Sequence, residues 1–198
     1  MGTHQMVNHV EMIYQPGQRD AAQALFETMG YATFTIPGGP WLGVNVDPES
    51  ELNSDNVMYA NEPTPAQKNF DAAFDRALTN DPELRDSLER YKAIRRKHPQ
   101  YVFHFGASVP TEQEWDERVA ALQEANRSHP LLKDRVDVKV SKPGVPDALG
   151  PLHQAFIYTD IISAGPGAIT PVLFDLQWIP PHRVETVSVP FPDMSTMV

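Results

Sequence analysis

The chain has 198 residues, of which 41% are hydrophobic and 21% charged, which is ordinary for a globular protein with one sizeable core. Because it contains no cysteine, disulfides, thiol nucleophiles and thiolate metal sites are excluded. Its formal net charge of −10 argues against nucleic acid as a partner. No apolar run approaches the roughly 20 residues that cross a bilayer, and the start, MGTHQMVNHV, does not resemble a secretion signal. We therefore expect a cytoplasmic protein without membrane contact.

The first part of the chain, residues 6–62, predicts the order β-α-β-β-β. The stretch MVNHVEMIY reads as a strand with His9 and Glu11 on one face. A short amphipathic helix, AAQALFETMG, follows it, and Gly30 is a suitable C-terminal stop for that helix. The segments YATFTIP, WLGVNVD and NVMYANE then read as strands separated by turn residues.

Residues 63–99 interrupt this pattern with helical periodicity. Apolar side chains recur at helical spacing on both sides of residues 79–82, where NDPE supplies Asp81 as a cap and Pro82 at the first helical position. We predict two helices that act as an elaborate linker or lid.

Residues 100–180 repeat the first order. YVFHFGASV reads as a strand with His104, Gly106 and Ser108 on its polar face and Tyr101, Phe103, Phe105 and Ala107 on an apolar face. Thr111 then opens a helix with a capping box, and DRVDVKVSK, HQAFIYTDII and PVLFDLQWIP read as three more strands. Two similar units in one chain indicate an internal repeat, in which His9 and His104 occupy matching positions.

The prediction is therefore an α+β fold, with all 198 residues in a single domain. It comprises a β-α-β-β-β module at residues 6–62, a helical linker at residues 63–99, a second module at residues 100–180 and an extended tail at residues 181–198.

The segments NHVEMIY, HFGASV and LFDLQW, in this repeated order, resemble the vicinal oxygen chelate superfamily, which includes glyoxalase I, bleomycin-resistance proteins and type I extradiol dioxygenases. The resemblance implies two modules around an open cavity, with metal ligands on the first and last strands of each module. Carried over, these ligands are His9, His104 and Asp175, the last where the family usually has Glu. For the last strand of the first module, Tyr59 and Glu62 are the nearest candidates.

Two imidazoles and one carboxylate form a triad that suits a divalent ion such as Fe, Mn, Ni or Zn. We expect an enzyme of isomerase or lyase type, in which the metal stabilises an enolate of a small oxygenated organic substrate. Two alternatives stay open: an Fe(II) ring-cleaving dioxygenase and a metal-free binding protein. Glu11, His153 and Tyr158 are the candidates for moving a proton, although His153 and Tyr158 have opposite parity in one strand. We also expect a homodimer.

Overall fold

The structure is a computed structural model that describes residues 9–49, 56–145, 152–165 and 171–180. The described residues form a mixed eight-stranded sheet with four α-helices, which confirms the α+β class. The predicted tail, residues 181–198, lies outside them, as do residues 6–8 of the first predicted strand. The strands are β1 (His9–Tyr14), β2 (Ala32–Thr35), β3 (Leu42–Asn45), β4 (Val57–Asn61), β5 (Phe105–Ser108), β6 (Val136–Ser141), β7 (His153–Ser163) and β8 (Pro171–Trp178). The helices are α1 (Arg19–Thr28), α2 (Pro65–Asn80), α3 (Pro82–Lys97), α4 (Glu112–Ser128) and a 3₁₀ turn, Pro99–Tyr101.

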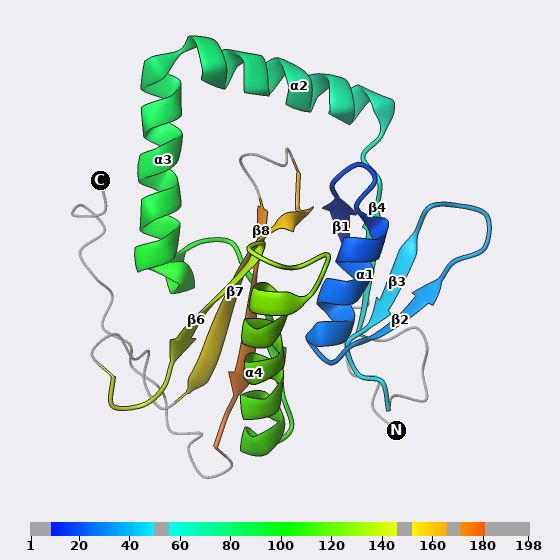
Figure 1. Cartoon of the computed structure of the whole chain (residues 1–198), viewed down its shortest axis with the longest axis vertical. Helices are drawn as coiled ribbons and strands as arrows, with labels where there is room; N and C mark the ends of the chain where they lie inside the picture. The colour runs from blue at the N-terminus through cyan, green and yellow to red at the C-terminus, as the bar shows by residue number, and fades with distance from the viewer. Residues whose placement is uncertain (1–8, 50–55, 146–151, 166–170, 181–198) are drawn as a thin grey trace, which may run out of the picture.

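The strands follow the order β2-β3-β4-β1-β7-β8-β5, and β6 also pairs with β7 (Figure 1). Two neighbouring pairs are parallel, β1 with β4 and β5 with β8, while the other pairs are antiparallel. The contact between β1 and β7 is short, because only Ile13 and Tyr14 of β1 are in register with β7. The pairing therefore brings the two parallel pairs into one continuous sheet.

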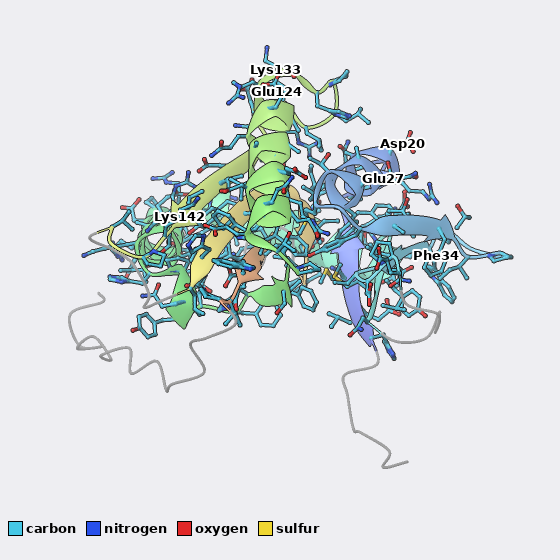
Figure 2. All side chains as sticks on the ribbon, turned by 90° about the horizontal axis from the view of Figure 1, so that it is seen from below. Asp20, Glu27, Phe34, Glu124, Lys133 and Lys142 are labelled. Carbon is cyan, nitrogen blue, oxygen red and sulfur yellow. The ribbon has the colours of Figure 1, made fainter. Side chains whose placement is uncertain are left out.

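Helices α1 and α4 lie side by side against one face of the sheet, as Figure 2 shows from below. The strands alternate accordingly: Phe174 and Leu176 of β8 point to the helices and are fully buried, whereas Asp175 points to the opposite face. Trp115 of α4 is also fully buried, and its Nε1 donates a 2.8 Å hydrogen bond to the Leu176 carbonyl. The apolar core thus fixes β8, and with it the orientation of Asp175. No helix among the described residues has the length and apolar character needed to span a bilayer.

The helix boundaries follow the signals in the sequence. Gly30, just past α1, has a positive φ of 84°, which suits a glycine stop. The Thr111 hydroxyl accepts a hydrogen bond from the Glu114 backbone N–H, and the Asp81 carboxylate accepts one from the Leu84 N–H. The cap residues and the glycine stop expected for these three helices are therefore confirmed.

Replacing Gly30 with alanine is expected to lower the free energy of unfolding by about 1 to 2 kcal/mol, because the backbone is left-handed and the end of the Arg118 side chain would have to shift. The added Cβ would lie 2.7 Å from the Arg118 Nε. Gly17 is a matched control, since its φ is 72° but an added Cβ would meet nothing within 4 Å. Urea unfolding should therefore give a smaller loss, about 1 kcal/mol, for Gly17→Ala. Equal losses would contradict the Arg118 contact.

The predicted helical linker consists of α2 and α3, which join at Asp81. Together they form an arch beside the sheet, with α2 along the top of Figure 1 and α3 returning toward the sheet. No residue of α2 is buried. At the far end of α3, the Arg95 guanidinium donates to the Pro171 carbonyl at 2.7 Å and Arg96 pairs with Asp137. The arch is thus anchored to the sheet through the end of α3.

The predicted strand at residues 101–109 is shorter in the structure. Residues 99–101 form the 3₁₀ turn and β5 begins only at Phe105, so His104 precedes the strand rather than lying within it. The prediction of a buried apolar face for this strand is also partly wrong, because the Phe103 side chain is 67% exposed. Pro99 begins the 3₁₀ turn, and with no backbone N–H it could not donate to a strand neighbour.

Candidate functional site

A cluster of polar side chains lies on the sheet face opposite α1 and α4. It is centred on Asp175 of β8, which is fully buried. One oxygen of this carboxylate, Oδ2, accepts hydrogen bonds from the side-chain amides of Gln154 and Gln177, at 2.8 and 2.5 Å. Register brings these groups together, because Gln154 of β7 pairs with Gln177 of β8. Two amides therefore fix the orientation of the carboxylate.

The other carboxylate oxygen of this cluster, Asp175 Oδ1, is buried and has no hydrogen-bond partner among the described residues. Burial raises the pKa of Asp175, while the bonds from Gln177 and Gln154 and the charge of His104 lower it in part. The amide oxygen of Gln154 and the hydroxyl of Ser141 are likewise buried without a partner in the described part of the chain. An unpaired buried acceptor is costly, and a cation or a hydrogen-bond donor would satisfy the free oxygens of Asp175 and Gln154.

His104 lies next to this cluster. Its Nδ1 is 2.8 Å from the Val102 carbonyl, which can only accept, so Nδ1 carries the proton and Nε2 keeps its lone pair when the ring is neutral. The ring meets Phe156 edge-on at 6.1 Å, and Phe156 is the register partner of Asp175. A histidine with one nitrogen held by a carbonyl is the arrangement found for metal ligands.

A pocket of about 880 Å³ opens beside the cluster. Its walls come from the starts of β1 and β4, the segment after β3, strand β5 and helix α4. Gly106 of β5 lines the pocket and is the register partner of Asp175, so one wall of the pocket adjoins the polar cluster. The lining residues are His9, Val10, Val46, Asp47, Pro48, Glu49, Asn56, Val57, Met58, Phe105, Gly106, Ala107, Ser108, Pro110, Glu114 and Arg118.

The charged groups of the pocket are unevenly placed. Arg118 contributes a guanidinium to the pocket, and this group lies 3.6 Å from a carboxylate oxygen of Glu114 on the same helix. His9 stands on the opposite wall, where its ring lies 5.7 Å from the ring of Tyr59. Asp47 and Glu49 add two carboxylates. The pocket is therefore mixed in charge and suits a ligand with several oxygen or nitrogen atoms better than a purely apolar one.

The other predicted site residues lie in different places. Glu11, exposed on β1, accepts a hydrogen bond from Asn61 at 2.7 Å. His153 packs on the helix side of the sheet, between Trp115 and Trp178. Tyr158 donates to the Arg95 carbonyl beneath α3, and burial raises its pKa to about 12.

Glu62, the other candidate ligand, instead pairs with Lys68 at 3.0 Å. Within the described ranges there is no group of three or more His, Cys, Asp or Glu side chains that could hold a metal. The structure thus places Asp175 and His104 in one neighbourhood and His9 in the adjoining pocket.

Sequence reasoning missed two residues of this region, Gln154 and Arg118. Gln154 could have been found from its parity, since in the predicted strand HQAFIYTDII it lies on the face opposite His153. Arg118 gave no signal, because an arginine in an amphipathic helix is ordinarily a solvated side chain.

Comparisons with known proteins add little. No protein-family model matches the chain, and no curated protein matches it by sequence. Among solved structures, the chain is similar to the hypothetical protein SA1046 from S. aureus, at 14% identity and a TM-score of 0.44. That match covers 90% of this chain and 96% of the other. A similarity this low does not assign a fold family or a function.

Proposed function

We propose that the chain is a vicinal-oxygen-chelate-type protein that binds a small oxygenated organic molecule in the pocket, beside a divalent metal ion. The metal would be held by His104 and Asp175, with His9 as a third ligand from the pocket wall. The observation that carries this proposal is the buried Asp175 Oδ1, which has no hydrogen-bond partner among the described residues and lies in the neighbourhood of His104.

The order of elements supports the family. A strand, a helix and three strands precede the arch, and the same series follows it. In both series the first strand is parallel to the last, as β1 is to β4 and β5 is to β8. The pocket lies between β1 and β5, which is where paired β-α-β-β-β modules would place a shared cavity.

The donor set suits a divalent ion. Imidazole nitrogen and carboxylate oxygen are ligands of Fe, Mn, Ni and Zn. Asp175 Oδ1 is buried and has no hydrogen-bond partner among the described residues, so a bound cation would satisfy this oxygen. Gln154 and Gln177 would act as orienting partners through Oδ2.

When bound, the metal would supply Lewis-acid stabilisation of an enolate or a similar anion. The other tasks fall to this chain's residues. The pocket walls would orient the substrate and limit its contact with water, and His9 would face it from β1. Glu11 is the proton acceptor we retain, because it follows His9 by two residues on the same face of β1, and His9 lines the pocket. None of Glu11, His153 and Tyr158 lines the pocket itself.

Elemental analysis of protein purified without chelators tests the proposal. We expect about one equivalent of metal per chain in the wild type and a loss of at least tenfold in metal affinity in His104→Ala. His129→Ala is the matched control, since His129 caps the end of α4 and lies outside the site. A wild type that stays metal-free after reconstitution would exclude the metal centre.

The metal-free binding protein is the second candidate, favoured by the lack of a three-ligand group within the described residues. It predicts the same pocket with no metal. Were iron the bound metal, the ring-cleaving alternative would be favoured over the isomerase or lyase. The identity of the metal therefore separates the candidates.

A further inference from the structure

Helix α2 has an apolar stripe that the described residues cover only in part, since Phe70 is exposed while Phe74 and Leu78 are half-buried. Phe70, Phe74 and Leu78 recur every four residues and so share one helix face, yet no residue of α2 is buried. Phe70 is 54% exposed, and on α3 Tyr91 is 44% exposed. Because a helix of this length is stabilised mainly by packing its apolar face, the exposed part of the stripe is a candidate contact surface.

The position of the arch, defined as α2 and α3, makes this stripe available. Figure 1 shows α2 leaving the end of β4 and crossing beside the sheet rather than lying on it. The end of α3 is held to the sheet through Arg95 and Arg96, and Lys139 donates to the carbonyls of Arg96 and Lys97. The arch is thus fixed at its base, while α2 projects from the body of the chain.

The charge of the arch is opposite to that of residues 9–62, which precede it. Residues 65–97 carry eight Lys and Arg against six Asp and Glu, whereas residues 9–62 carry one Arg against eight Asp and Glu. Asp20 and Glu27 lie on the outer side of α1 in Figure 2. On the arch, Arg76 and Lys97 are exposed and form no ion pair with any described residue. The two regions are therefore complementary in charge.

We propose that the arch docks on the acidic region formed by residues 9–62 of a second copy of this chain. If the arch of each copy docks on the other copy, the two contacts are equivalent and produce a closed dimer with two-fold symmetry. The apolar stripe of α2 would be buried in this interface, and the cations of the arch would face the carboxylates of the partner. The second copy is favoured as the occupant because the acidic surface that complements the arch belongs to the same sequence.

Sedimentation equilibrium over about 1 to 100 μM protein tests this dimer. We expect a dimer whose dissociation constant rises about 100-fold in Phe70→Glu, because that side chain would lie within the buried interface. Arg76→Glu should raise it about tenfold, and added salt should weaken the wild-type dimer. Leu131→Glu and Arg127→Glu are matched controls outside the arch, at a residue 42% exposed and at one paired with Glu124.

A monomeric wild type throughout this range would overturn the proposal, as would a dimer that the arch variants leave intact. Hydrogen exchange on the wild type tests the docking without any substitution, so its result does not depend on whether the variants fold. The amides of residues 65–80 should become more protected as protein concentration rises, and protection independent of concentration would contradict docking. Neither measurement depends on a bound metal, so this inference and the proposed function fail separately.

Discussion

Replacing Asp175 with asparagine should stabilise the metal-free protein at neutral pH by about 1 to 3 kcal/mol. The side-chain oxygen of asparagine could still accept the two amide hydrogen bonds from Gln154 and Gln177. The neutral amide would remove the buried charge, and its N–H groups would replace the unpartnered Oδ1. The same change would remove a metal ligand, so the gain in stability should come with a loss of metal binding.

The pH dependence of this effect has a definite sign. The pKa of Asp175 is raised in the folded protein, so its protonated form is favoured by folding. The stability that it contributes is complete below the unfolded pKa of a carboxyl group and is lost as the pH rises through the folded value. The wild type should therefore lose more stability than Asp175→Asn as the pH rises from acid toward neutrality.

Urea unfolding in the presence of a chelator, at several pH values, measures both effects. Asp160→Asn is the control, because Asp160 is 69% exposed and pairs with Arg135 at the surface, and its loss should change stability by no more than about 0.5 kcal/mol. A marked destabilisation by Asp175→Asn in chelator would contradict an uncompensated carboxylate at this position.

Replacing Trp115 with alanine is expected to cost about 3 to 5 kcal/mol of unfolding free energy. The side chain is fully buried, donates to the Leu176 carbonyl and meets His153 edge-on at 5.4 Å. Since Leu176 follows Asp175 on β8, loss of this contact should also weaken metal binding without touching a ligand.

Trp115→Phe separates the two contributions of this residue. It keeps most of the apolar volume but leaves the Leu176 carbonyl without the indole donor, so we expect a smaller cost of about 1 to 3 kcal/mol. Thermal and urea unfolding of the two variants measure the difference. Equal costs would mean that packing contributes nothing beyond the hydrogen bond.

Much of the fold could be predicted because its signals are local. The apolar side chains of α1 and α4 recur at helical spacing, and the caps at Asp81 and Thr111 mark where helices begin. The alternation of Phe174, Asp175 and Leu176 already placed the carboxylate opposite the core. These features depend on residues that are close together along the chain, so one sequence is enough to predict them.

The rest depends on contacts between distant segments. The short β1–β7 pairing decides how the sheet is joined, and no residue of β1 signals it. His104 was placed within a strand because alternation extended that far, whereas β5 begins only at Phe105, after a 3₁₀ turn. The hydrogen bond from Gln154 to Asp175 joins two strands, and only the register reveals it.

The most direct test of the proposed metal centre is an anomalous difference map from crystals grown with Mn²⁺. We predict a single peak at the Asp175 carboxylate, close enough to His104 for its Nε2 to be a ligand. A map with no peak there, or with manganese bound only elsewhere, would contradict the metal centre and leave a metal-free binding pocket as the better description.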